Sequence, residues 1–98
     1  MSRAALPGMI ITAHARLRYR QRIAPGADDR EARVVLAAAS RRAVRQEERT
    51  IHGNPTWRVD DPPMVLVTKH DPACGCVVVT VLTLADWAMV AELMTWAP

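Results

Sequence analysis

"MVLVTKHDPACGCVVVTVLT", residues 64–83, consists of two apolar runs rich in β-branched residues on either side of a short polar segment. Runs of Val, Leu and Thr bounded by Asp, Pro and Gly are typical of β-strands joined by a tight connection. The second run, residues 76–83, is apolar at nearly every position, which is the pattern of a central strand covered on both faces. The stretch therefore predicts a β-hairpin that forms the middle of a sheet.

The residues before this hairpin extend the sheet. "TWRVD", residues 56–60, is typical of a further strand, and "DPP" separates it from the hairpin. "GNP" at 53–55 has the composition of a turn. Residues 43–52 are ambiguous, and we interpret their later part as a strand. These patterns predict an antiparallel sheet of three to four strands.

Two helices are predicted ahead of the strands. Thr12 suits the N-cap of a helix that runs to about residue 21 or 23, where "APGADD" ends it. Asp28 followed by Glu31 resembles a capping box, and the helix that it opens should stop between residues 40 and 44.

A third helix is predicted after the strands, because Thr83 and Asp86 form another capping signature before an apolar segment that reaches residue 96. Two N-terminal helices packed on a small antiparallel sheet of 3–4 strands, followed by an apolar C-terminal helix at 84–96, make an α+β fold.

The 98 residues are expected to form a single domain, 1–98, with residues 1–9 as a loose lead-in. Half of the residues are apolar, which indicates a folded rather than a disordered chain. No signal peptide is visible, no apolar run has the length needed to cross a bilayer, and two cysteines are too few for a disulfide scaffold. The expected location is cytoplasmic, without membrane contact.

Charge is distributed unevenly along the chain. Residues 1–58 carry twelve of the thirteen basic side chains and five acidic ones, a net charge of +7, whereas residues 59–98 have a net charge of −4. Such asymmetry indicates an anionic partner for the first half, either RNA or an acidic protein surface. Neutralisation of one half by the other within the molecule is the alternative.

The segment "ITAHARLRYRQRI", residues 11–23, concentrates this charge. On a helix, His14, Arg18 and Arg22 are spaced i, i+4 and i+8 and form one row, with Gln21 beside it. Like charges at this spacing repel one another unless an anion neutralises them, and guanidinium groups bind phosphate bidentately. The row therefore predicts phosphate binding by Arg18 and Arg22. The alternative is that these arginines pair with carboxylates of the fold, for which Asp60, Asp61 and Glu47 are available.

Three residues from the strands are further site candidates. His52 precedes a Gly turn and could share acid–base work with His14, or serve only as a turn residue. Thr80 places one hydroxyl in "VVVTV". This hydroxyl could point into a functional site or form a hydrogen bond within the sheet. Lys69, beside His70, ends the strand before the hairpin turn and adds a second small basic cluster, assigned to phosphate binding.

His70, Cys74 and Cys76 are the only soft metal ligands that lie close together in the sequence. A structural zinc site normally has four ligands at characteristic spacings, whereas this segment offers three with a single Cys-x-Cys. A hairpin loop without a metal is therefore the favoured interpretation. We predict no metal and no cofactor.

The last helix is apolar nearly all round. Such a helix is either embedded in the core or partly covered by another molecule. Met89, Leu93 and Trp96 are the residues left for a protein partner or for a second copy in a homodimer.

"HARLRYRQRI" resembles the His-Ala-x-x-Arg-(Met/Tyr)-x-x-Arg helix of small bacterial and phage domains related to RelE-type toxins. "RTIHGNPTW", "MVLVTK" and "VVVTVL" resemble the later strands of the same group. That group is similar to the wider barnase, colicin and RelE ribonuclease superfold, in which helices precede a small antiparallel sheet.

The resemblance implies how a site would work. Active members cut RNA without a metal, because the ribose 2′-hydroxyl attacks the adjacent phosphate while side chains move protons and stabilise charge. By this resemblance His14 would be a general base or acid, and Arg18 and Arg22 would bind the scissile phosphate. His52 would be the proton partner and Thr80 a hydrogen-bond donor.

The sequence favours a RelE/barnase-like RNA-binding domain and leaves open whether it is also a toxin-like, metal-independent endoribonuclease. The alternative is a non-catalytic interaction or inhibitor protein of a phage or toxin–antitoxin system, which binds an acidic protein surface and dimerises through its last helix. A DNA-binding regulator ranks third, because its DNA-facing helix would also have to pack the domain.

Overall fold

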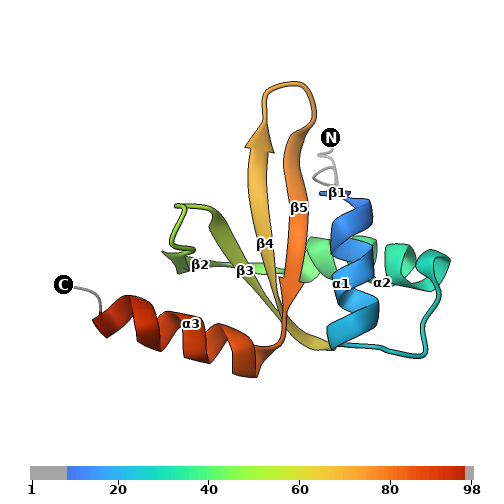
Figure 1. Cartoon of the computed structure of the whole chain (residues 1–98). Coiled ribbons are helices and arrows are strands. Elements are labelled where there is room, and N and C mark those ends of the chain that lie inside the picture. The colour runs from blue at the N-terminus through green and yellow to red at the C-terminus, as the bar shows by residue number, and fades with distance from the viewer. Residues whose placement is uncertain (1–8, 97–98) are drawn as a thin grey trace.

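The computed structural model describes residues 9–96, with side chains described for residues 9–90. After a two-residue strand, the elements follow one another in the order αα-ββββ-α (Figure 1). The elements are β1 (Ile10–Ile11), α1 (Ala13–Arg22), α2 (Asp29–Arg42), β2 (Val44–Arg49), β3 (Pro55–Asp60), β4 (Pro63–Asp71), β5 (Gly75–Leu82) and α3 (Leu84–Trp96).

The five strands form one sheet in the order β1-β5-β4-β3-β2. Strands β2 to β5 are antiparallel to their neighbours, while β1 pairs with β5 in parallel. The predicted α+β class and the hairpin, made by β4 and β5, are confirmed. The four antiparallel strands match the expected number, and β1 adds a fifth that the sequence analysis did not include.

The strand predicted to be covered on both faces, β5, is only partly covered. Residues 76–83 were expected to be covered on both faces, but β4 is the middle strand of the five, and β5 lies between it and the short strand β1. Residues 64–68 of β4 are all buried, whereas most of β5 is only half-buried. The reason is that β1 pairs only with Val77 and Val78, so the rest of β5 has no neighbouring strand on that side within the described residues and lies at a sheet edge.

The three predicted helix caps are confirmed. The hydroxyl of Thr12 accepts a hydrogen bond from the backbone N–H of Ala15 at 3.1 Å, and the carboxylate of Asp28 accepts one from Glu31 at 2.8 Å. Thr83 does the same for Asp86 at 3.0 Å. Each cap supplies an acceptor for a backbone donor that the first turn of a helix leaves unpaired.

The strand expected in the later part of residues 43–52 lies instead in the earlier part, as β2. Residues 50–54 form the turn to β3, where Gly53 has φ +82 and the Thr50 hydroxyl accepts from the N–H of Asn54 at 3.1 Å. Only glycine adopts such a φ without strain, so the turn is fixed around Gly53 and the strand must end before it.

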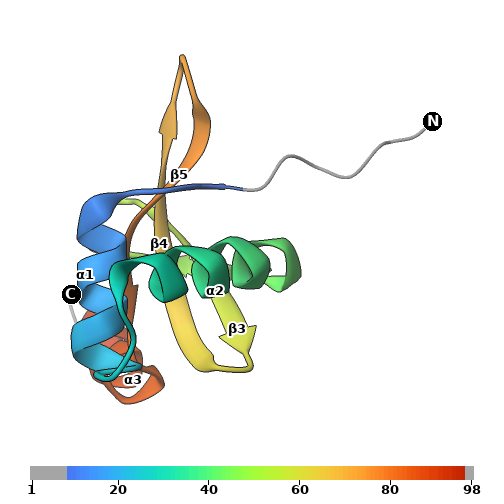
Figure 2. The same ribbon diagram turned by 90° about the vertical axis from the view of Figure 1, so that its right-hand side faces the viewer.

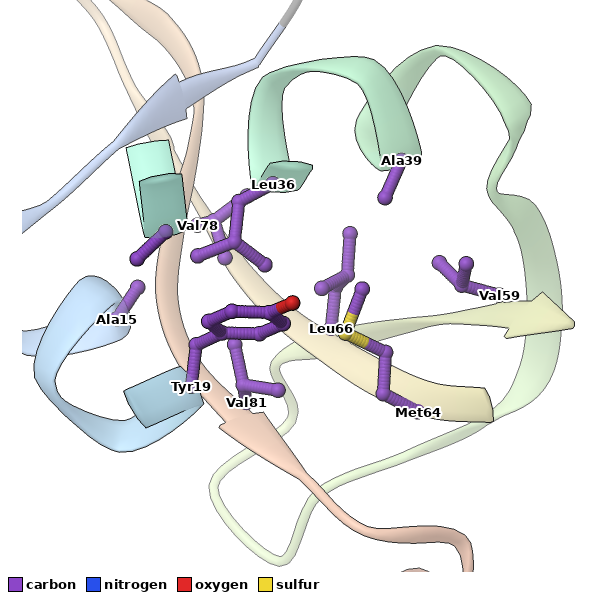
Figure 3. Close-up of a cluster of buried hydrophobic side chains, with 10 residues drawn as sticks. Ala15, Tyr19, Leu36, Ala39, Val59, Met64, Leu66, Val78 and Val81 are labelled. Atoms are coloured by element: carbon purple, nitrogen blue, oxygen red, sulfur yellow. The ribbon is translucent and has the colours of Figure 1, made fainter. Parts of the chain in front are cut away.

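Helices α1 and α2 pack against each other and cover the same face of the sheet (Figure 2). Helix α1 lies on β5, and α2 runs across to β3. Their buried side chains meet those of three strands in one cluster (Figure 3). The cluster contains Ala15, Tyr19, Ala32, Leu36, Ala39, Val59, Met64, Leu66, Val78 and Val81.

The other face of the sheet is met by α3, which begins directly after β5 and contacts β4. The register places Leu66 opposite Val81 in the core, so the next pair, Val67 and Thr80, points to this second face. Val67 is buried, as is Trp87 of α3.

None of the described helices has the length and apolar character needed to cross a membrane.

Candidate anion-binding site on the first helix

The arginine-rich face of α1 is set by the residues that the helix buries. Ala15 and Tyr19 point into the core. Helical periodicity then places His14, Arg18 and Arg22 along one flank of α1, as the sequence predicted, while Arg16 and Arg20 lie on the other. His14 is exposed, and Arg18 and Arg22 are half-buried. We call these three residues the His14–Arg22 row.

Arg18 is held by two neutral groups of its own helix. Its Nε donates a hydrogen bond to Nε2 of His14 at 3.3 Å, and its Nη1 donates to Oε1 of Gln21 at 2.8 Å. His14 therefore contacts Arg18 as a hydrogen-bond acceptor. The two bonds orient the guanidinium without neutralising its charge.

Arg22 is held by the sheet. Its Nη1 donates a 2.8 Å hydrogen bond to the carbonyl oxygen of Val81 in β5. Nearer the start of α1, Thr12 donates to the carbonyl of Val78 from its hydroxyl at 2.9 Å and from its N–H at 3.3 Å. Residues at both ends of α1 thus bond to carbonyls of β5.

No carboxylate lies within 4 Å of the nitrogens of Arg18 or Arg22 among the side chains that the structure describes. The ion pairs among the described side chains are instead Arg16 with Asp29 at 2.8 Å and Arg58 with Asp60 at 3.4 Å. The alternative that Asp60, Asp61 or Glu47 would neutralise the row is therefore wrong.

The arginines on the other flank of α1 support the fold. Arg16, besides its bond to Asp29, donates from Nη1 to the carbonyl of Ile11 at 3.0 Å. Arg20 donates from Nε to the carbonyl of Ala27 at 2.9 Å. These bonds tie α1 to the segments before it and after it.

His52 does not join the His14–Arg22 row. It is exposed in the β2–β3 turn. Strand β2 forms the sheet edge opposite to β1, with β3 and β4 between it and β5, so the turn lies far from α1 (Figure 1).

Thr80 and Lys69 also lie apart from the row. Thr80 is on β5, beneath α1, but its pairing with Val67 directs its side chain to the face away from the helix. Lys69 is exposed on β4 opposite Val77, and the alternation along β4 directs its side chain, like that of Val67, to the face away from the helices. The row therefore consists of His14, Arg18 and Arg22 alone among the six predicted catalytic and phosphate-binding residues.

The hairpin turn next to Lys69 is built by Asp71. One carboxylate oxygen accepts from the N–H groups of Ala73 at 2.8 Å and Cys74 at 3.0 Å. These two bonds lower the pKa of Asp71 below its usual value. Cys74 and Cys76 are free thiols, and no three His, Cys, Asp or Glu side chains within the described part of the chain cluster as metal ligands would.

Of the predicted partner-binding residues, Met89 is 60% exposed on α3. The side chains of Leu93 and Trp96 lie outside the described residues.

One feature of the site was not predicted. A solvent-open hollow of about 330 Å³ lies at the end of α1, lined by Arg22, Ile23, Pro62, Pro63, Thr83 and Leu84. It is formed by three segments that are far apart in the sequence, so no local sequence pattern predicts it. Of the lining residues, the prolines stand out in the sequence, but only as part of the "DPP" break between two strands.

No protein-family model, curated protein or solved structure matches this chain. The fold and the site define it as a small α+β domain with a basic helix flank whose arginines are oriented by neutral partners.

Proposed function

We propose that this protein is a RelE/barnase-like RNA-binding domain that binds RNA phosphates through the His14–Arg22 row. The observation that carries the proposal is the state of Arg18 and Arg22. Both are oriented by uncharged acceptors, and neither has a carboxylate within 4 Å among the described side chains.

Such arginines suit a polyanion. A guanidinium has five N–H donors and keeps its charge, so bonds to neutral groups leave donors for phosphate oxygens. Because the groups are already oriented, little side-chain entropy is lost when the anion binds. Residues four apart on a helix are about 6 Å apart along its axis. That spacing is comparable to the distance between successive phosphates of an unstacked strand.

The resemblance to RelE-type domains supports RNA over other polyanions. The motif "HARLRYRQRI" falls on α1, and two helices precede the antiparallel strands, as in that group. General acid–base cleavage needs a proton acceptor and a proton donor at the reacting phosphate. Since His52 and Thr80 lie away from His14, our proposal rests on binding, and cleavage is an additional outcome to be measured.

The alternative function is a non-catalytic protein that binds an acidic protein surface and dimerises. The exposed side chain of Met89 on α3 favours it. The same arginines would then bind carboxylates of a partner.

The test combines binding and cleavage in one assay. Purified full-length chain is incubated with total tRNA and with a labelled single-stranded RNA in EDTA, and run on native and denaturing gels. We expect a retarded complex, weakened about tenfold by Arg18→Ala because this variant cannot form the charge-assisted bond to phosphate. His14→Ala, checked for folding by circular dichroism, would abolish any product if His14 takes part in cleavage. Absence of a complex with either RNA would exclude the proposal and favour the protein-binding alternative.

A further inference from the structure

The hollow at the end of α1 continues the His14–Arg22 row. Arg22 belongs to both, because it is the last residue of the row and part of the hollow's wall. The remaining wall consists mainly of the apolar side chains of Ile23, Pro62, Pro63 and Leu84. The guanidinium of Arg22, which the bond to Val81 holds in place, therefore lies beside the apolar part of the hollow.

Arg22 has donors to spare at this place. One N–H of its Nη1 is used by the carbonyl of Val81. Four of the five guanidinium N–H groups remain. The guanidinium of Arg22 donates no other hydrogen bond to a described residue, and no carboxylate among the described side chains lies within 4 Å of it.

The ligand chemistry that fits is an anionic group joined to a flat apolar body. A nucleotide has this form, since its phosphate is anionic and the faces of its base are apolar enough to pack between apolar side chains. The volume of about 330 Å³ is at the small end for ligand sites. It is large enough to hold one base.

We infer that the hollow holds one unpaired base of a single-stranded RNA whose phosphates bind Arg18 and Arg22. This inference rests on the proposed function and adds the substrate class. In a duplex the bases are stacked and paired, so a base can enter the hollow only from an unpaired region.

The experiment measures fluorescence anisotropy of the full chain with a labelled RNA of about 12 nucleotides. The same strand is used alone, hybridised to its complement, and as an abasic ribose-phosphate oligomer of equal length. We expect the single strand to bind about tenfold more tightly than the duplex or the abasic oligomer.

Leu84→Ala removes part of the apolar wall without changing charge. It should weaken binding of the single strand about fivefold and leave the abasic oligomer unaffected, because only a base contacts that wall. Leu84→Met, which keeps an apolar wall, should retain most of the affinity. Val34→Ala is the matched control, since Val34 is 62% exposed on α2 and outside the hollow. Urea unfolding checks that each variant is folded.

Two results would contradict the inference in different ways. If the RNA binds but single strand, duplex and abasic oligomer bind alike, and Leu84→Ala behaves as Val34→Ala does, the hollow holds no base while the proposed function stands. If no RNA binds, the proposed function fails and the inference fails with it.

Discussion

Arg22 and Val81 are 59 residues apart in the sequence, and a 2.8 Å hydrogen bond from Nη1 of the arginine to the carbonyl of the valine joins them. The bond connects the last turn of α1 to the part of β5 that β1 does not cover. Arg22 therefore supports the fold as well as the proposed site. Arg18, whose partners His14 and Gln21 belong to its own helix, supports only the site.

Substitution of these two arginines should separate the two roles. Arg22→Ala should lower the free energy of unfolding by about 1 kcal/mol, because a half-buried carbonyl loses its charged donor. Arg18→Ala should change it by less than about 0.5 kcal/mol, as is usual for substitutions at the surface. Urea unfolding followed by circular dichroism measures both. Equal losses of stability would contradict the assigned roles.

Thr68 and Trp57 provide a test of the sheet's packing. Thr68 is 1% exposed, and its hydroxyl accepts a hydrogen bond from the indole N–H of Trp57 at 2.9 Å. Thr68→Val keeps the side-chain shape but removes the acceptor, which should cost about 1–2 kcal/mol of stability.

The same bond can be followed by NMR through hydrogen exchange of the Trp57 indole proton. Exchange should be faster in Thr68→Val and stay slow in Thr68→Ser, which keeps the acceptor. Equal exchange in both variants would show that the hydroxyl does not protect the indole.

Tyr19 should make stability fall at alkaline pH. Burial raises its pKa above the usual 10.0, and the nearby charge of Glu31 raises it further. The folded state thus holds the phenol proton more tightly than the unfolded state does. This contribution to stability is complete below pH 10.0 and is lost as the pH rises through the folded-state pKa.

Because the chain contains one tyrosine, its phenolate absorbance reports Tyr19 directly. The midpoint in the native protein should lie above that in urea, and Glu31→Gln should lower it. Identical midpoints in the native and urea-unfolded protein would contradict the burial of the phenol.

Asp71 should make the hairpin turn sensitive to acid. Its pKa is below the usual 3.8 because of the two backbone N–H bonds, so its contribution is present above pH 3.8 and disappears as the pH falls through the lower folded-state pKa. The amide shifts of Ala73 and Cys74 should titrate together with a midpoint below 3.8. Asp71→Asn should remove this titration, and a midpoint at or above the usual value would contradict the bonding.

The sequence predicted those parts of the fold whose signals are local. Thr12, Asp28 and Thr83 cap helices through bonds to residues three positions ahead, so the pattern and the contact coincide. Strand β1 has no such signal. It is two residues long and exists because α1 and β5 place Ile10 and Ile11 beside Val77 and Val78.

The same distinction holds for the site. The His14–Arg22 row follows from the helical repeat alone, and the structure keeps it together. Thr80 and Lys69 depend on which face of the sheet the helices cover, and the register places both on the opposite face. The turn position of His52 and the hollow beside Arg22 depend on how distant segments meet, which residue spacing does not encode.

The central claim is that the position of Arg18, rather than net charge, determines RNA binding. Arg18→Glu and Arg33→Glu both reduce the net charge of +3 by two units, and Arg33 is exposed on α2, outside the row. Affinity for the single-stranded RNA is measured by anisotropy over a range of salt concentrations. Arg18→Glu should weaken binding by more than about tenfold and reduce the salt-dependence slope by about 0.7 for each phosphate that the variant no longer neutralises, whereas Arg33→Glu should change affinity by less than about twofold. Equal losses of affinity in the two variants would show that binding follows total charge, and the claim for the His14–Arg22 row would fail.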